Sequence, residues 1–343
     1  MIRTIALHFF TCALCLCAPV AALAVTIPTV PVGNAGNAND PSTGNVHGGV
    51  AYRYEIGATE VTNSQYAEFL NAKAASDPLG LYQPLMAISN SGGITRSGAS
   101  GSYTYSLKPN MGNKPVTHVS GYDSIRFANW LHNGQGAGDT ETGAYTLLGG
   151  TPVPSNGDTI TRNVGAKWFL PNENEWYKAA FYQPALQGGD ADNYWLYPTR
   201  SNTAPTIATA IDLLGPTRGD IGNPGANVAN YRNGANWNFQ SGNVTTVGSA
   251  GPLSQSYYGT SDQGGNVFEW IEKSSSGSGA TLRGGSYVSS SGSGLNSSSA
   301  GASPWDIEFS NAGFRIATVP EPGTFCLAAF AGLALLAIRR RRG

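Results

Sequence analysis

The stretch Gly265-Asn-Val-Phe-Glu-Trp270, with Leu282-Arg-Gly-Gly-Ser-Tyr287 and Gly313-Phe-Arg315 after it, decides the fold of this chain of 343 residues. Regular structure around these stretches is sparse and local. Short runs rich in strand-forming residues occur at 52–56, 144–148, 167–170 and 281–283. The pattern predicts short strands set among long loops.

Helices are predicted at three capping sequences upstream. They are Thr62-Asn-Ser-Gln65, Ser120-Gly-Tyr-Asp123 and Asn172-Glu-Asn-Glu175, and apolar residues follow each at helical spacing. No charge run or linker divides residues 25–318, so we expect a single domain. The predicted fold class is α+β, with few regular elements and long loops.

Composition excludes two classes of protein. With 20 Lys+Arg against 21 Asp+Glu, the chain has no basic excess to neutralise phosphates, which excludes an electrostatic nucleic-acid binder. Hydrophobic residues make up 41% and aromatic residues 10% of the chain, enough to bury a large core and to argue against disorder.

The first 24 residues are typical of a signal peptide. Arg3 precedes an apolar run that ends on Ala22-Leu-Ala24, which predicts cleavage before Val25. A lipid anchor is the less favoured alternative, because no Ala, Gly or Ser directly precedes the cysteines at 12, 15 and 17. Residues 25–53 are rich in Gly and Asn, and we expect a loose lead there before the domain at 54–318.

The last 25 residues, 319–343, have three parts in order. Val319-Pro-Glu-Pro322 is followed by an apolar segment at 323–338 and by four arginines at 339–342. This order resembles the PEP-CTERM sorting signal of Gram-negative bacteria. The resemblance implies a transient transmembrane anchor in the inner membrane, recognition by an exosortase, and release to the cell surface or extracellular matrix. An ordinary C-terminal membrane anchor is the alternative.

Cysteine is absent between the two ends. Cys12, Cys15 and Cys17 lie in the predicted signal peptide, and Cys326 lies in the apolar tail. Disulfides, thiolate metal sites and cysteine nucleophiles are therefore excluded from the domain.

The ordered motifs resemble the sulfatase-modifying factor domain, the family of the formylglycine-generating enzyme. Besides the three stretches quoted first, they include Glu60-Val-Thr-Asn-Ser-Gln-Tyr66, Lys114-Pro-Val116, Phe127-Ala-Asn-Trp-Leu131 and Phe169-Leu-Pro-Asn-Glu-Asn-Glu-Trp176. The match runs from about residue 54 to 317. It implies an irregular, C-type-lectin-like fold with many buried aromatic residues.

Formylglycine synthesis is not expected here. In the family, two cysteines shortly after the Gly-Gly-Ser motif hold a copper ion, because Cu(I) prefers soft thiolate ligands. Those positions fall near Ser289 and Gly294 in this chain. We expect no copper and assign no catalytic residue.

Iron chemistry of another family branch is not expected either. Only His47, His118 and His132 lie outside the signal peptide, and none pairs with another at ligand spacing. His118 is predicted to be a satisfied surface or cap histidine. Structural capping is predicted for Glu173 and Glu175 in the third helix, and for Glu60 in a similar way.

Calcium is the cofactor that the resemblance implies, as a structural ion. The family loop would bind it through the carbonyls of Gly264, Gly265 and Val267 and the carboxylate of Glu269, and such hard oxygen ligands suit calcium. The alternative for Glu269 is a buried loop anchor that accepts hydrogen bonds from backbone N–H groups.

A second calcium site of the family would match Asn230 and Tyr231. Its remaining ligand is an aspartate in the family, and residues 235–243 offer only asparagines. This second site is therefore the weaker prediction.

The active-site groove of the catalytic relatives would match Trp270, Arg283 and Ser286, and we predict that it persists as a binding cleft. The aromatic residues at 194–197 either contribute stacking or belong to the core, which is more common.

The predicted function is an exported, non-catalytic module that binds an extracellular polysaccharide or a surface protein. Two alternatives stay open. One is an enzyme of the family that oxidises or hydrolyses without cysteine, and the other is a structural component of the matrix.

Overall fold

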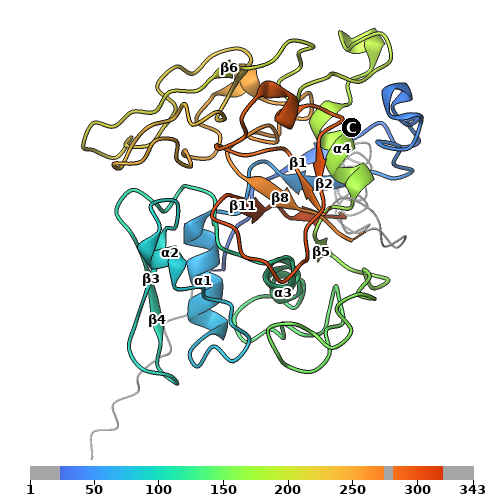
Figure 1. The fold of residues 1–343 in the computed structure, drawn as a ribbon. Coiled ribbons are helices and arrows are strands. Elements are labelled where there is room, and N and C mark those ends of the chain that lie inside the picture. The colour runs from blue at the N-terminus through green and yellow to red at the C-terminus, as the bar shows by residue number, and fades with distance from the viewer. Residues whose placement is uncertain (1–23, 274–280, 320–343) are drawn as a thin grey trace, which may run out of the picture.

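The computed structural model describes residues 24–273 and 281–319 (Figure 1). The predicted signal peptide, except Ala24, and the predicted membrane segment at 323–338 lie outside these residues. Within the described part of the chain, no helix has the length and apolar character needed to cross a membrane.

Helices form where the capping sequences predict them. The structure contains α1 (Asn63–Lys73), α2 (Leu85–Ile88), α3 (Gly121–His132) and α4 (Glu173–Phe181), with 3-10 turns η1 (Pro41–Thr43), η2 (Ala185–Gln187), η3 (Pro252–Ser254) and η4 (Gly292–Leu295). The caps Thr62, Ser120 and Asn172 each accept a hydrogen bond from the backbone N–H three residues on, and that residue's side chain bonds back to the cap. All three predicted starts are confirmed.

Strands form two small four-stranded sheets and two pairs. One sheet has the antiparallel order β1 (Thr29–Val32), β2 (Tyr54–Gly57), β12 (Ala317–Thr318), β5 (Trp168–Phe169). The other has the order β10 (Ala300–Gly301), β9 (Leu282–Arg283), β8 (Phe268–Trp270), β11 (Ala312–Phe314), with β8 and β11 parallel. The pairs are β3 (Ile94–Ser97) with β4 (Thr104–Leu107), and β6 (Thr206–Ile207) with β7 (Val228–Ala229).

The strand predicted at 144–148 is not formed. The side chain of Asn129 in α3 takes the place of a strand partner, because its amide bonds both the N–H and the carbonyl of Tyr145, at 2.7 and 3.1 Å. A side chain thereby satisfies backbone groups that a neighbouring strand would otherwise pair.

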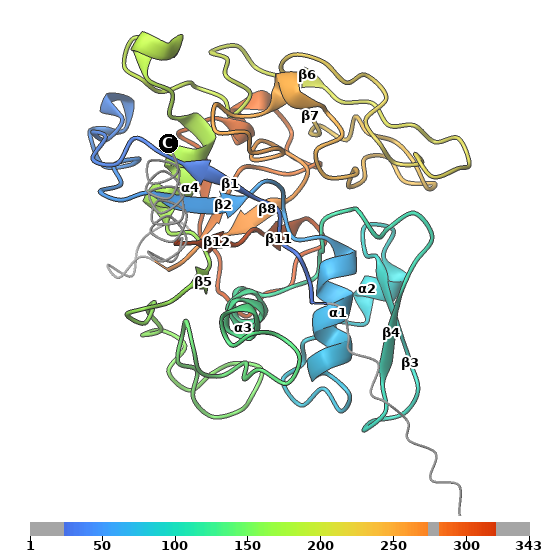
Figure 2. The same cartoon turned by 180° about the vertical axis from the view of Figure 1, so that it is seen from behind.

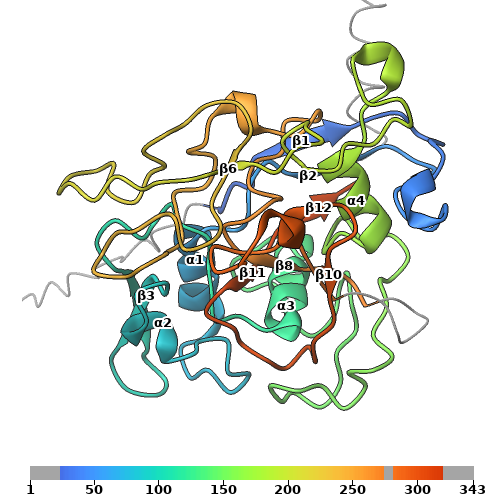
Figure 3. The same ribbon diagram turned by 45° about the horizontal axis from the view of Figure 1, so that its top comes forward.

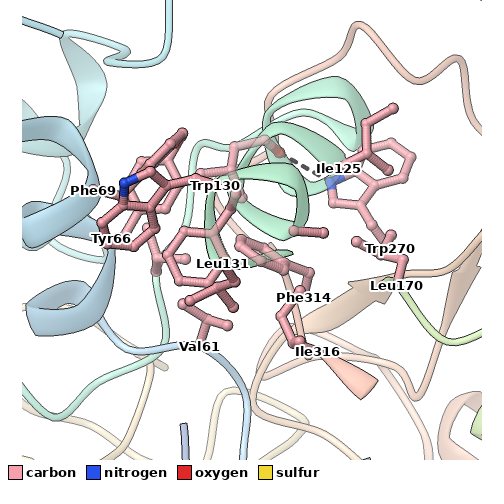
Figure 4. Close-up of a cluster of buried hydrophobic side chains, with 14 of the residues drawn as sticks. Val61, Tyr66, Phe69, Ile125, Trp130, Leu131, Leu170, Trp270, Phe314 and Ile316 are labelled. Atoms are coloured by element: carbon pink, nitrogen blue, oxygen red, sulfur yellow. Dashed lines mark hydrogen bonds between the residues drawn. The ribbon is translucent and has the colours of Figure 1, made fainter. Parts of the chain in front are cut away.

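An aromatic core joins α1 and α3 to the second sheet (Figure 4). Phe69 of α1 lies 5.3 Å from Trp130 of α3 between ring centroids, and Phe127 lies 5.4 Å from Phe314 of β11. Offset and edge-on ring pairs of this kind add to the energy of apolar burial. The α+β class with long loops is confirmed.

Loops make up most of residues 185–260, which lie on the opposite side of the sheets from α1 and α3 (Figures 1 and 2). Asparagine side chains tie these loops together. Asn223 accepts from the N–H of Thr209 and donates to the carbonyl of Ile207, and Asn230 donates to the carbonyl of Asn243. Local side-chain bonds to the backbone replace sheet ladders here.

The prediction of a loose lead at 25–53 is wrong. β1 pairs along its length with β2, and the following loop lies beside α4 (Figures 1 and 3). Asp40 is buried and accepts a hydrogen bond of 2.6 Å from the hydroxyl of Tyr177 in α4. Asn37 bonds the carbonyl of Gly48 across the loop. The Gly and Asn residues that indicated looseness are in fact the residues that bond this loop to itself.

Candidate functional site

The two positions matched to the copper cysteines lie next to each other. A Cβ built on Gly294 would be 3.3 Å from the Cβ of Ser289. The hydroxyl of Ser289 accepts from the N–H of Ser286 at 2.9 Å. The positions thus present one hydroxyl and one hydrogen atom where a copper site needs two sulfur atoms.

The three residues predicted to line a cleft are all buried. Trp270 packs in the core and donates its indole N–H to the carbonyl of Val119 at 2.9 Å. Arg283 donates to the carbonyl of Ser297 at 3.0 Å, and the hydroxyl of Ser286 is held by an asparagine. The aromatic residues Tyr194 and Tyr197 are buried too, as the core interpretation predicts.

Glu269 forms a buried ion pair with Arg315, and neither side chain is exposed. Two guanidinium nitrogens lie 2.6 Å from the two carboxylate oxygens, and the indole N–H of Trp176 donates to the same carboxylate at 2.7 Å. Arg315 also donates to the carbonyls of Gly57 and Ser261. Side chains, rather than backbone N–H groups, therefore bond the Glu269 carboxylate.

A calcium ion does not fit at Glu269 as the side chains stand. Arg315 already supplies the positive charge, and a divalent cation would lie beside a buried guanidinium. The loop itself is tight, because Gly265 has a φ of +94° and any Cβ there would be 2.3 Å from the carbonyl oxygen of Asn230.

Asn230 fits an oxygen-liganded cation better. Its amide nitrogen bonds the carbonyl of Asn243, whereas its buried Oδ1 has no hydrogen-bond partner among the described residues. A buried acceptor without a donor is costly, and a cation would satisfy it. The carbonyl of Tyr231 follows in the chain, as the second family site requires.

Two further predictions about titratable residues are wrong. His118 is buried, and neither ring nitrogen has a partner within the described ranges. Burial, helped by the charge of Lys108, lowers the pKa of His118 to about 4. Glu60 does not cap a helix. It is buried, its Oε1 accepts from the amide of Asn266, and its Oε2 has no partner among the residues that the structure describes. Nowhere in residues 24–273 and 281–319 do three or more His, Cys, Asp or Glu residues gather so as to hold a metal.

A pocket of about 400 Å³ collects polar and aromatic side chains elsewhere on the domain. We name it the Trp305 pocket, and it is lined by residues 46–47, Tyr145, 160–162, 172–174, 272–273 and Trp305. None of the predicted cleft residues is among them. Because the lining comes from six separate segments, no motif in the sequence marks it. Asn172-Glu173-Asn174 is the part of the lining that a sequence pattern identifies, and that pattern predicts only the start of a helix.

Arg162 organises one wall of the Trp305 pocket. Its guanidinium lies 2.7 Å from Glu175 and 2.7 Å from Glu272, and it stacks over the ring of Phe169. The hydroxyl of Tyr145 donates to Glu272 at 2.5 Å. Burial raises the pKa of Glu272, and the charge of Arg162 opposes that rise. Glu175 keeps its predicted capping role and gains this ion pair.

The other charged side chains of the pocket are paired as well. Glu173 accepts from the Nε of Arg283 at 3.0 Å and lies 3.7 Å from the imidazole of His47. Burial lowers the pKa of His47, although the charge of Glu173 opposes this. Lys273 donates to the carbonyl of Gly157 and lies 3.4 Å from Asp158.

Trp305 is a buried residue of the pocket lining. The side chain is 2% exposed and packs against Tyr122, with ring centroids 5.8 Å apart. Its indole N–H is buried and finds no acceptor among the residues that the structure describes. The nitrogen is enclosed by protein and is not open to the pocket, so the ring of Trp305, rather than its N–H, belongs to the wall.

Comparison with protein families gives two matches. Residues 25–319 match the sulfatase-modifying factor enzyme 1-like domain, and residues 318–342 match the PEP-CTERM protein-sorting motif. The first match includes the segment at 25–53 that is folded onto the domain. No curated protein matches the chain.

Three solved structures are similar to this chain, and the likeness to CarF shows the fold. CarF aligns with a TM-score of 0.50 and 21% identity over 86% of this chain and 99% of its own. Treponema denticola variable protein 1 aligns with a TM-score of 0.43 and 18% identity, over 86% of this chain and 95% of its own. PvdO from Pseudomonas aeruginosa aligns with a TM-score of 0.42 and 16% identity, over 86% of this chain and 92% of its own. With the family match over most of its length, this chain belongs to the family of the sulfatase-modifying factor enzyme 1-like domain, and it carries a PEP-CTERM motif that marks it for export and sorting by an exosortase.

Proposed function

We propose that this protein is a non-catalytic binding module of the cell surface or extracellular matrix, and that the Trp305 pocket is its ligand site. The observation that carries the proposal is a pocket of about 400 Å³ whose wall combines paired charges with the polar side chains of Asn172 and Asn174. Pockets of 300–1,000 Å³ with a few placed polar groups are typical small-ligand sites. Extracellular polysaccharide and surface proteins are the partners that the sorting motif makes available.

The absence of thiols at Ser289 and Gly294 supports a role without formylglycine synthesis. The ion pairs of the pocket support binding over acid–base catalysis. Arg162 and Tyr145 bind the Glu272 carboxylate through three hydrogen bonds, and the charge of Arg162 favours the ionised form over the protonated form that a general acid needs.

A pocket-filling substitution tests the proposal. Co-sedimentation of the full chain with the host's extracellular polysaccharide should be saturable, and Thr161→Trp, at an exposed residue of the pocket wall, should abolish it. Thr206→Trp, at an exposed residue of β6 outside the pocket, is the matched control and should bind normally. Equal binding by both variants would remove the pocket from the function. Turnover of a substrate that requires Glu272 would favour the enzyme instead.

Calcium is retained as a proposal, at Asn230 rather than at Glu269. The orphaned Oδ1 of Asn230 and the carbonyl of Tyr231 would contribute ligands, and no carboxylate strengthens them. Asn230→Asp adds the missing negative charge. Thermal unfolding is measured with and without calcium at about 1 mM, the order of magnitude at which weak extracellular sites bind it. Calcium should raise the Tm of Asn230→Asp more than that of the native chain. No calcium response in either protein would refute the proposal.

A further inference from the structure

We propose that, in the membrane-anchored intermediate that the sorting motif implies, the domain lies directly on phospholipid headgroups. It contacts them with the edge of the sheet β1-β2-β12-β5 at which the C-terminal tail leaves the domain. We name this surface the exit edge, and it comprises residues 52–53, 164 and 167–168. The inference goes beyond the proposed function and makes no use of the Trp305 pocket.

Strand β12 fixes the point where the tail leaves the domain. It is an inner strand, which pairs with β2 on one side and with β5 on the other. Ala317 lies between Ile56 and Phe169, and all three residues are buried. Pulling β12 away would therefore break hydrogen-bonded pairs on both sides and expose this part of the core. The tail thus starts from a rigid position in the sheet.

The tether between this strand and the predicted membrane segment is short. Four residues, 319–322, separate β12 from the apolar segment at 323–338. A fully extended chain of this length spans at most about 18 Å, whereas a compact domain of about 290 residues has a radius of gyration of about 19 Å. A tether shorter than this radius does not let the domain turn over. The exit edge must therefore face the membrane while the tail is inserted.

The side chains of the exit edge suit a lipid interface. Arg53 directly precedes β2 and Lys167 directly precedes β5, and both residues are exposed. Because β12 is antiparallel to both strands, these two cations lie on either side of the tail. Each has an aromatic neighbour in the chain, Tyr52 and Trp168. Aromatic rings and long basic side chains are the groups that gather at membrane–water interfaces.

An exposed valine extends the exit edge. Val164 lies in the turn before β5, and its side chain is 106% exposed. Contact with the lipid interface would remove this apolar surface from water. β2 also carries Glu55, whose half-buried carboxylate accepts a hydrogen bond of 2.5 Å from the hydroxyl of Thr29. Two cations against this one carboxylate leave the exit edge positive, which favours an anionic lipid surface.

Apolar exposure alone does not identify the membrane side. The loops at 205–245 extend away from α4 and β12 to the other end of the molecule (Figures 1 and 2), and they expose Leu213, Leu214 and Phe239. The short tether does not bring this end to the membrane. Leu214, which is 87% exposed, is therefore a matched reference for Val164, and both positions should tolerate substitution because neither side chain packs in the core.

Contact with lipid is measured by fluorescence quenching in vesicles. Outside the predicted signal peptide the one cysteine is Cys326, so single probes are attached at Val164→Cys or Leu214→Cys in a Cys326→Ser background. The exported full chain, made in a host without an exosortase, is reconstituted into vesicles of phosphatidylethanolamine and phosphatidylglycerol, some of whose headgroups carry a nitroxide quencher. We expect the probe at 164 to be quenched at least about two-fold more than the probe at 214, because the domain is wider than the contact range of the nitroxide.

A longer tether separates the affinity of the exit edge from mere proximity. A flexible Gly-Ser linker of about 20 residues, inserted after Val319, gives the tail a reach of about 25 Å, which exceeds the radius of the domain. The probe at 164 should remain the more strongly quenched one. In this background Arg53→Gln should lower the ratio of docked to undocked domain by about five-fold, the worth of one basic residue beside an anionic surface. Arg232→Gln, at an exposed residue of the loops at 205–245, is the matched control and should leave the ratio unchanged.

Equal quenching at the two positions with the native tether overturns the proposal, and so does a full chain that does not float with the vesicles. Preferential quenching that disappears with the linker would mean that the tether alone holds the domain near the membrane, which overturns lipid binding by the exit edge. If lipid quenching is absent and a probe at 164 crosslinks in cells to a membrane protein, the exit edge contacts the sorting enzyme instead. Polysaccharide co-sedimentation tests the Trp305 pocket separately, so either proposal can fail alone.

Discussion

Two arginines bind carboxylates in this domain with similar geometry and with different consequences. Arg315 and Glu269 are completely buried and join β11 to β8, the end of β2 and the loop at Ser261. Arg162 holds Glu175 and Glu272 at the wall of the Trp305 pocket and is 17% exposed. The comparison teaches that access to solvent, rather than the chemistry of the pair, separates a structural anchor from part of a binding site.

The burial of each ion-pair network determines how much stability is lost when one of its charges is removed. A buried pair is strongly destabilising to break, because the remaining partner stays charged in a medium of low dielectric constant. At the pocket wall, Glu175 is buried but Glu272 is 14% exposed, and Glu272 can take up a proton when Arg162 is removed because burial raises its pKa. The two networks should therefore respond differently to the same substitution.

The largest effect is expected for Arg315→Met. The substitution leaves Glu269 buried without its cation and removes the bonds to Gly57 and Ser261, at a cost of about 3–5 kcal/mol in unfolding free energy. Urea unfolding of the variant measures this loss. Arg218→Met is the matched control, since Arg218 pairs with the exposed Asp212 and should cost under about 1 kcal/mol. Equal losses would break the distinction between buried and exposed pairs.

A smaller loss is expected for Arg162→Met. Glu272 can become protonated and Glu175 keeps its helix-capping bond, so we expect a cost of about 2 kcal/mol. Co-sedimentation with the extracellular polysaccharide should be lost as well, because the wall of the pocket loses its organising cation. The measurements are urea unfolding and co-sedimentation of the same preparation. A variant as unstable as Arg315→Met would show that the pocket network is a structural anchor too.

The smallest effect concerns pH around Arg315. Burial raises the pKa of Asp262 to about 6, although the N–H of Gly248 and the charge of Arg315 oppose this rise, and the charge of Glu269 adds to it. The folded state therefore holds a proton that the unfolded state releases near pH 4, so this contribution to stability is present below pH 4 and is lost as the pH rises towards 6.

Asp262→Asn removes that dependence. Asn can still accept the hydrogen bond from Gly248, and it tolerates the left-handed φ of +61° at this position. Relative to the native chain, the variant should gain stability between pH 4 and 6 and no more above pH 6. The gain should be about 1–2 kcal/mol, below the roughly 3 kcal/mol that the full rise in the pKa gives, because Asp262 is partly exposed. Unfolding at pH 4, 5, 6 and 7 measures the difference. A constant difference across this range would show that Asp262 does not titrate in it.

Local features were predictable from sequence because their causes are local. The capping sequences at Thr62, Ser120 and Asn172 place acceptor and donor three residues apart, and the structure forms all three. The prediction for residues 25–53 is wrong because the structure of this segment depends on contacts with residues that are distant in the chain. Gly and Asn indicate loops, but they do not show that Asp40 will meet Tyr177, which lies 137 residues away in the chain.

The sequence by itself determined the family, the α+β class, the sorting motif and the lack of thiols at Ser289 and Gly294. Only the tertiary structure decided that Arg315 takes the carboxylate of Glu269, and that residues from six segments enclose the pocket beside Trp305. The physical reason is distance along the chain. Ion pairs and pockets depend on which surfaces the packed core brings together, and no local pattern records that arrangement.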